Sequence, residues 1–268
     1  MTQLKERAYS SPENIRKRHS ERQRKRIRRM KIRRTVFFSV LFLIAVFIIL
    51  FYTPIFNIRS IEIQGNQKVE ESVILSSIGD VEGNNIFRTK VSSIKKNILT
   101  IPYIDTVEID RVILSSKLAV TVTECEEAAF ITTSSGYVII DSSAKVLAQA
   151  AENEMPVGIP EVTGLSVTNV TVGEKLNIEE SDKFDILVEC LDIMKKIDIL
   201  SGVRSISVAD VSNITFNYED RLDAICGTSV DLEKKLSFFK SAVNSSRLTE
   251  NSRGTIDLTT AGRVIYSP

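Results

Sequence analysis

The sequence predicts an α+β protein in which one membrane-spanning helix precedes two mixed helix-and-sheet domains. Three observations predict this class: an uncharged apolar stretch near the N-terminus, helical stretches with one apolar face, and short runs of alternating apolar and polar residues. The chain has 268 residues, of which 43% are apolar and 26% charged. This composition argues against a wholly disordered chain, a collagen-like repeat and a polytopic membrane protein.

The apolar stretch is long enough to cross a bilayer. Residues 35–58 carry no charge, and only Ser39 interrupts the apolar run at residues 36–52. About 20 helical residues span the roughly 30 Å of a bilayer's hydrocarbon core. A buried core helix would show a polar face, and a cleaved signal would have a shorter apolar region before a small-residue cleavage site. We therefore expect an uncleaved helix at residues 35–55.

Charge is distributed unevenly on the two sides of this helix. Residues 1–34 hold 14 Lys and Arg against 3 Asp and Glu, whereas residues 53–268 hold 21 against 31. The positive-inside rule predicts that residues 1–34 form a basic cytoplasmic arm and that the larger part is exported. Contact of the arm with anionic lipid stays open, but residues 18–34 lack an aromatic side chain to stack on a base, so no nucleic-acid partner is expected.

The first exported domain is expected at residues 56–125. Ile61 and Ile63 alternate with polar residues before a turn, which indicates a strand. Helices are expected at residues 69–78 and 91–99, and two further strands at residues 106–110 and 118–122. Two helices in this order can cover one face of a three-stranded sheet.

The second domain is expected at residues 126–268, as a β domain that ends in edge strands. Residues 137–140 and 145–147 predict a hairpin, and residues 181–199 and 231–243 predict two amphipathic helices. Further strands are expected at residues 203–208, 213–217, 222–226, 255–258 and 263–266.

Residues that could carry out catalysis or bind a metal are sparse. His19, the only histidine, lies in the arm, so no exported Ser-His or Cys-His pair can form. Cys125, Cys190 and Cys226 lack the close spacing of zinc ligands, and three cysteines cannot all pair within one chain. Cys190 lies beside an apolar helix stripe and Cys226 ends a strand, which favours buried free thiols, although one disulfide stays possible.

Two other patterns could suggest chemistry. Ser142 and Lys145 match the Ser-x-x-Lys pattern of penicillin-binding acyltransferases, but three other Ser/Lys pairs match it too, and its companion motifs are missing. The carboxylates Glu124, Glu126 and Glu127 are expected to form a solvated rim. We therefore predict no enzyme activity, no cofactor, no metal and no small-molecule substrate.

Several segments of the first exported domain carry a resemblance to a known family: residues 56–66 (FNIRSIEIQGN), 83–87 (GNNIF) and 101–104 (IPYI). They are similar to the POTRA domain of the FtsQ/DivIB family of bacterial cell-division proteins. Residues 136–141 (GYVIID), 145–147 (KVL) and 158–165 (GIPEVTGL) are similar to the start of its β domain. The chain departs from the family pattern at residues 115–117, where a proline is common, and at Cys125, where arginine is common.

The resemblance implies a bitopic scaffold at the division septum, with a cytoplasmic N-terminus and extracytoplasmic domains, that helps regulate septal peptidoglycan synthesis. Its implied partners are bitopic coiled-coil division proteins of the FtsL and DivIC/FtsB type. These would bind by adding a strand to the closing edge. The partner-binding residues carried over are Thr255, Ile256, Leu258, Gly262, Val264, Ile265 and Tyr266. The alternatives are a signal-anchored envelope sensor or cell-wall-associated protein, and an outer-membrane assembly factor, which would need repeated POTRA units.

Overall fold

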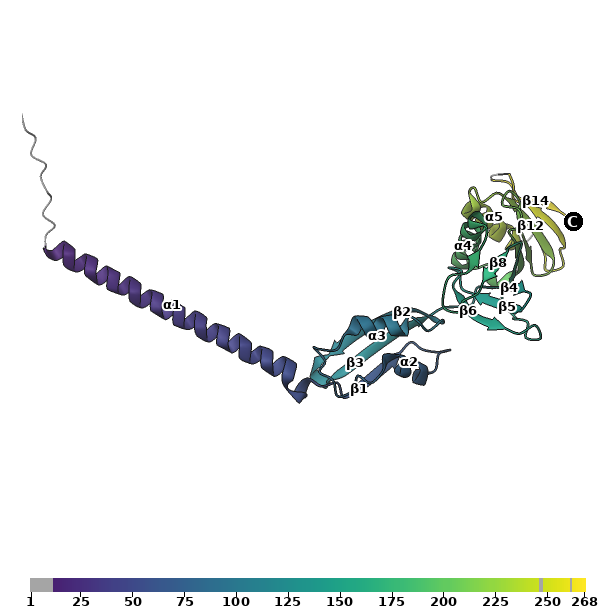
Figure 1. Cartoon of the computed structure of the whole chain (residues 1–268). Coiled ribbons are helices and arrows are strands. Elements are labelled where there is room, and N and C mark those ends of the chain that lie inside the picture. Colours follow the sequence, from purple (N-terminus) through teal and green to yellow (C-terminus); the bar gives the residue numbers. More distant parts are fainter. Residues whose placement is uncertain (1–11, 246–247, 261) are drawn as a thin grey trace, which may run out of the picture. The chain divides into compact units, whose positions relative to one another are not determined.

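The computed structural model describes residues 12–245, 248–260 and 262–268. Its first element is the long helix α1 (Pro12–Tyr52), drawn in purple in Figure 1. Within Arg28–Tyr52 an 18-residue window has a mean hydropathy of 2.8, and the helix is long and apolar enough to cross a membrane. Residues 35–52 of the predicted span are helical, but α1 ends at Tyr52 and the 3-10 turn Pro54–Phe56 follows, so the helix ends three residues before the predicted limit. At its other end the helix extends back to Pro12, which the sequence did not predict.

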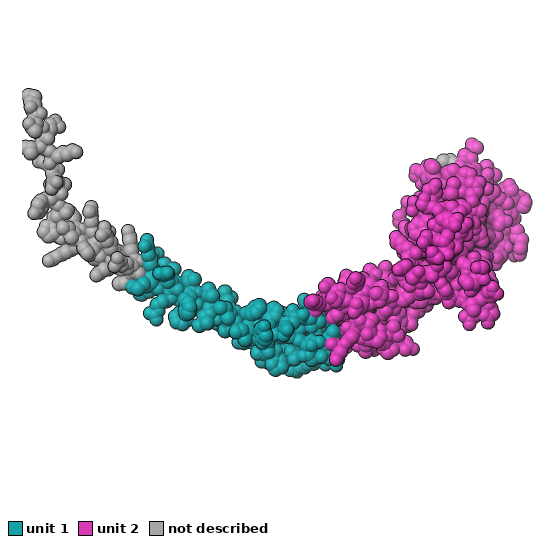
Figure 2. All heavy atoms as spheres, in the orientation of Figure 1, with its two compact units in different colours: residues 1–60, 81–89, 111–118 teal, residues 61–80, 90–110, 119–268 magenta. Residues whose placement is uncertain are grey.

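The chain divides into two compact units, coloured separately in Figure 2. Unit 1 comprises the described part of residues 1–60 together with residues 81–89 and 111–118. Unit 2 comprises residues 61–80, 90–110 and the described part of 119–268.

The strand-helix-helix-strand-strand order predicted for residues 56–125 is confirmed. A three-stranded sheet has the order β1 (Ser60–Gln64), β3 (Lys117–Glu124), β2 (Ile104–Val112). Helices α2 (Glu71–Ile78) and α3 (Val91–Ile98) each bury two isoleucines against it. The short 3-10 turns η1 (Pro54–Phe56) and η2 (Ile113–Ser115) lie before β1 and between β2 and β3.

Helix α2 begins two residues later than the sequence predicts, and a carboxylate accepts hydrogen bonds from the backbone of the preceding loop. The N–H groups of Gln67, Lys68 and Val69 donate to Glu124 at 2.8–2.9 Å. The carboxylate of Glu124 therefore holds the loop that leads into α2.

A nine-stranded sheet dominates the rest of the chain, in the order β14-β13-β12-β11-β10-β7-β4-β5-β6. Its strands along the chain are β4 (Ala129–Thr133), β5 (Gly136–Ile140), β6 (Val146–Ala150), β7 (Glu161–Thr163), β10 (Val203–Ser207), β11 (Ile214–Tyr218), β12 (Leu222–Gly227), β13 (Gly254–Asp257) and β14 (Ile265–Ser267). β7 pairs in parallel with β4 and β10, and β12 with β13, while the other neighbours are antiparallel. β8 (Val167–Asn169) and β9 (Asn177–Ile178) form a separate ribbon.

Helices α4 (Ser181–Lys196) and α5 (Leu232–Val243) form one core with the large sheet. Helix α4 ends three residues before the predicted limit, and the 3-10 turn η3 (Leu200–Gly202) follows it. Phe239 of α5 is fully buried and meets the rings of Phe216 and Tyr218 edge to face, at centroid distances of 4.8 and 5.2 Å. The apolar face that the sequence predicts for α5 is therefore the face that packs against the sheet.

Candidate protein-binding edge

β14 lies at the open end of the large sheet and pairs antiparallel with β13. The facing residues are Thr255 with Ser267, Ile256 with Tyr266 and Asp257 with Ile265. In the described part of the chain no strand lies on its other side. The terminal strand is therefore an edge strand, as the sequence predicts, and can pair with an added strand.

The hydrogen bonds of β13 determine which backbone groups of β14 point outward. Leu258 N–H donates to the Ile225 carbonyl at 2.8 Å and Gly254 N–H to the Arg221 carbonyl at 3.1 Å, so even-numbered residues of β13 face β12. Odd-numbered residues therefore face β14, and their hydrogen-bonded partners are Ile265 and Ser267. The N–H and C=O of Tyr266 accordingly point to the open side.

The opposite edge of the sheet is partly covered. Val146 of β6 donates its N–H to the Glu174 carbonyl and accepts from Gly173 N–H, both at 2.8 Å. The side-chain amide of Gln149 also donates to the Val170 carbonyl at 3.4 Å. Of the two edges, β14 is thus the one whose backbone groups are available.

The carried-over partner-binding residues fall into three groups. Ile256 and Leu258 lie in the hydrophobic core, with 0% and 1% of their surface exposed. Thr255 and Val264 are half-buried. Gly262, Ile265 and Tyr266 are exposed, and the side chains of Ile265 and Tyr266 point to opposite faces of β14. Direct side-chain contact with a partner is therefore open to Ile265 and Tyr266, whereas Gly262 can offer only its backbone. The buried pair Ile256 and Leu258 is not available for such contact.

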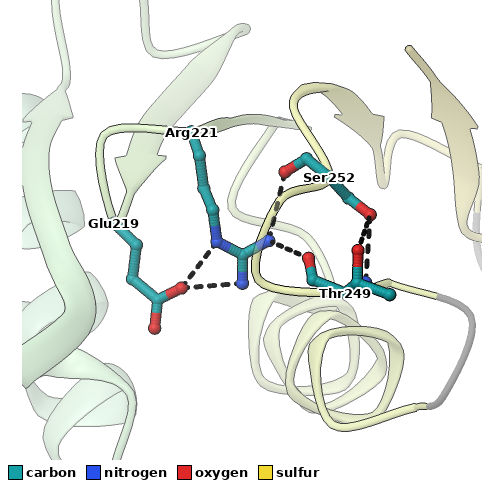
Figure 3. Close-up of polar contacts among 4 residues, drawn as sticks. All are labelled: Glu219, Arg221, Thr249 and Ser252. Atoms are coloured by element: carbon teal, nitrogen blue, oxygen red, sulfur yellow. Dashed lines mark hydrogen bonds and ion pairs between the residues drawn. The ribbon is translucent and has the colours of Figure 1, made fainter.

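A loop held by Arg221 precedes β13, and sequence reasoning missed this arginine. Its Nη1 donates to the carbonyls of Thr249 and Ser252 at 3.2 Å, and its Nε donates to Glu219 at 2.7 Å (Figure 3). Only 9% of the Arg221 side chain is exposed. Arginine therefore ties the turn between β11 and β12 to the segment that leads into β13.

Tyr266 is tied to the same region. Its hydroxyl donates to the Arg253 carbonyl at 2.7 Å, which fixes the direction of the ring on one face of β14. At the other end of β13, Asp257 Oδ1 accepts from the N–H and the hydroxyl of Thr259 at 2.8 and 2.6 Å. These two hydrogen bonds lower the pKa of Asp257 and close the strand with a turn.

The carboxylates expected to form a solvated rim have specific partners in unit 2. Burial tends to raise the pKa of Glu124, but the three backbone donors of residues 67–69 outweigh it and lower the pKa. Glu127 accepts from the Tyr103 hydroxyl at 2.7 Å and pairs with Lys68 at 2.7 Å. Only Glu126, whose side chain is 77% exposed and pairs with Lys195, fits the expectation.

The Ser142/Lys145 pattern lies in the turn between β5 and β6. Asp141 Oδ1 accepts from the N–H groups of Ser143 and Lys145, each at 2.8 Å, and so shapes the turn. Lys145 Nζ donates to the Ile104 carbonyl at 2.8 Å. The turn therefore has a structural explanation, and the ammonium group of Lys145 is bonded to a backbone carbonyl.

The three cysteines are free and buried, which agrees with the favoured interpretation. Burial raises the pKa of Cys190 and of Cys226 to about 12, and that of Cys125 to about 11. Thiols with raised pKa are poor nucleophiles and metal ligands. Among the described residues, no group of three or more His, Cys, Asp and Glu could hold a metal ion.

Comparison with known proteins finds one matching domain family and several proteins of similar sequence. The family description "POTRA domain, FtsQ-type" matches residues 56–124. The chain is 27% identical over 216 residues to the cell division protein DivIB of Clostridium acetobutylicum, covering 80% of this chain and 84% of the relative. It is 25% identical over 187 residues to DivIB of Clostridium tetani, covering 70% and 69%. It is 29% identical over 161 residues to the cell division protein FtsQ of Corynebacterium glutamicum, covering 53% and 71%.

Proposed function

We propose that this chain, which belongs to the FtsQ/DivIB family of cell-division proteins, acts as a bitopic scaffold of the division machinery that holds other divisome proteins at the septum. It would act by binding these proteins, and this binding would help regulate septal peptidoglycan synthesis. The Lys145 ammonium and the three thiols, which could have suggested catalysis, have structural roles that the described contacts and burial account for.

The proposed topology has the N-terminus in the cytoplasm. The basic residues on one side of the apolar helix support this orientation through the positive-inside rule. We assign residues 1–34 to a cytoplasmic arm, residues 35–55 to the membrane span, residues 56–125 to the POTRA-like domain and residues 126–268 to the β domain.

The proposed binding mode is strand addition to β14. The observation that carries it is the outward direction of the Tyr266 N–H and C=O on a strand with one open side. An extended segment could pair with these groups, while Ile265 and Tyr266 offer side-chain contacts on the two faces of the edge. The proposed partners are bitopic coiled-coil proteins of the FtsL and DivIC/FtsB type.

A pair of variants at one position tests this mode. Tyr266→Pro removes the outward N–H, whereas Tyr266→Phe keeps it and removes only the hydroxyl that donates to Arg253. Capture of a DivIC/FtsB-type protein from the same organism is measured with the full-length chain in detergent. We expect Tyr266→Pro to lose capture and Tyr266→Phe to retain most of it. Full capture by a Tyr266→Pro variant with unchanged thermal unfolding would refute strand addition at β14.

Localisation separates the division scaffold from an envelope sensor. A fluorescent tag on the N-terminus of the full chain is expected to give a midcell band that appears with constriction. An even distribution around the envelope in dividing cells would favour the sensor or cell-wall alternative instead.

A further inference from the structure

The turn between β2 and β3 exposes an unusual apolar surface. Val112, Ile113 and Leu114 are 42%, 43% and 103% exposed, so the Leu114 side chain is fully open to its surroundings. The three residues are consecutive and lie in or beside the 3-10 turn Ile113–Ser115. Single exposed apolar residues are common on protein surfaces, but a projecting run of three indicates a contact with an apolar phase or partner.

This turn is bonded to the chain segment that leaves the membrane. Ser116, which follows it directly, donates its hydroxyl to the Ile55 carbonyl at 3.3 Å, and its own carbonyl accepts from the N–H of Arg59 at 2.8 Å. Asn85 donates its side-chain amide to the Leu50 carbonyl in the last turn of α1 at 2.9 Å. The apolar turn therefore belongs to unit 1, together with the anchor helix (Figure 2).

The charges around the turn complement a phospholipid surface. In the exported residues of unit 1 (53–60, 81–89 and 111–118), four cations stand against one carboxylate, Glu82. The cations, all exposed, are Arg59, Arg88, Arg111 and Lys117. Residues 53–268 as a whole carry 21 Lys and Arg against 31 Asp and Glu, so the acidic excess lies elsewhere. Positive charge is thus concentrated at the end of the domain that adjoins the span, where lipid phosphates are located.

Aromatic side chains are clustered at the same end of unit 1. Phe51 of α1 lies 5.9 Å from Phe87, which in turn lies 5.4 Å from Phe56, measured between ring centroids. Arg88 lies over the Tyr52 ring at 5.6 Å. Tyrosine rings and arginine side chains are typical of the membrane–water interface, because one end of each is apolar and the other polar.

From these observations we infer that residues 112–114 insert into the interfacial layer of the lipid leaflet from which the anchor emerges, while the flanking cations bind lipid phosphates. The POTRA-like domain then has two membrane contacts, the helix and this turn. Two contacts keep it close to the bilayer, whereas the helix alone would leave it free to move relative to the membrane. The inference requires that α1 spans a membrane. It does not require that β14 binds a partner, so either proposal can fail alone.

The absence of tryptophan from the sequence makes a direct test possible. Leu114→Trp places a single tryptophan on the turn, and Val157→Trp places a matched one at a position that is 94% exposed in the β domain. Each full-length variant is reconstituted into vesicles of phosphatidylcholine and phosphatidylglycerol with no other protein. Fluorescence is recorded with and without lipids brominated close to the headgroup.

We expect the tryptophan of the Leu114→Trp variant to emit at shorter wavelength and to be quenched by the brominated lipid, and that of Val157→Trp to remain unquenched. An unquenched Leu114→Trp variant would overturn the inference and would leave a protein partner as the occupant of the turn. Equal quenching of both variants would overturn it too, because it would indicate general adsorption. Adding Arg59→Glu and Lys117→Glu to Leu114→Trp is expected to reduce quenching, and unchanged quenching would overturn the role of the cations.

Discussion

Gly254 packs against the backbone of Ser267 so closely that a Cβ at position 254 would overlap the Ser267 carbonyl oxygen. The φ angle of Gly254 is +143°, in a region that residues with a side chain rarely adopt. The first residue of β13 therefore has to be glycine for β14 to lie beside it. This relationship connects a residue outside the predicted binding set with the position of the proposed docking edge.

Gly254→Ala should displace β14 and abolish partner capture. The backbone strain alone costs about 1–3 kcal/mol of unfolding free energy, and the overlap with Ser267 adds to it. Gly158→Ala is the matched control, because Gly158 has a φ of +88° but a Cβ at this position would meet no other atom within 4 Å. Thermal unfolding and partner capture are measured for both variants. Normal capture by Gly254→Ala would contradict the role assigned to this glycine.

Arg221→Ala should loosen the loop that leads into β13. The substitution leaves two carbonyls without their donor and Glu219 without its ion pair, a loss of about 1–3 kcal/mol. Arg204→Ala removes a more exposed pair with Asp220 and should cost less than about 1 kcal/mol. Denaturant unfolding of the two variants gives the comparison. Equal and small losses would show that the Arg221 hydrogen bonds contribute little to stability.

The lowered pKa of Glu124 predicts that its hydrogen bonds to the loop at residues 67–69 depend on pH. Its folded pKa is lower than the ordinary value of 4.5, so its stabilising hydrogen bonds are fully present above that pH. They are lost as the pH falls through the folded pKa, because the carboxylate is then protonated in the folded state as well. Amide exchange of Lys68 and Val69, corrected for intrinsic rates, should therefore accelerate on acidification.

Glu124→Gln should accelerate the exchange of the same amides at neutral pH, since a neutral amide oxygen is a weaker acceptor than a carboxylate. Glu126→Gln serves as the control, because the Glu126 side chain is exposed and pairs with Lys195 on another segment. Unchanged exchange in Glu124→Gln would mean that the loop is held by other contacts.

Periodicity predicted most of the elements whose residues alternate in burial, but it missed the strands β4, β7, β8 and β9. The alternation at Ile61 and Ile63 and the apolar stripe of α4 each led to the correct element. β4 (Ala129–Thr133) was missed because its first three residues are all buried, so a central strand shows no alternation. β7 (Glu161–Thr163) has only three residues, too few for a pattern. The strand order β10-β7-β4 depends on pairings between distant segments, which a local pattern does not contain.

The candidate edge could be predicted only in part. The alternating run that ends the chain indicated a terminal strand, but the direction of the Tyr266 backbone groups depends on the register with β13, and that register is tertiary information. No sequence pattern pointed to the role of Arg221, because its partners at Thr249 and Ser252 are backbone carbonyls, which every residue has. The burial of Ile256 and Leu258 likewise follows from their packing in the shared core and not from their spacing.

Hydrogen exchange at Tyr266 tests strand addition most directly. The chain contains six tyrosines, so labelling with nitrogen-15 tyrosine gives a spectrum simple enough to follow this one amide in the full-length protein in detergent micelles. We expect the Tyr266 amide to exchange quickly in the free chain and to become protected when a DivIC/FtsB-type partner binds. Binding of the partner without any gain of protection at Tyr266 would contradict strand addition.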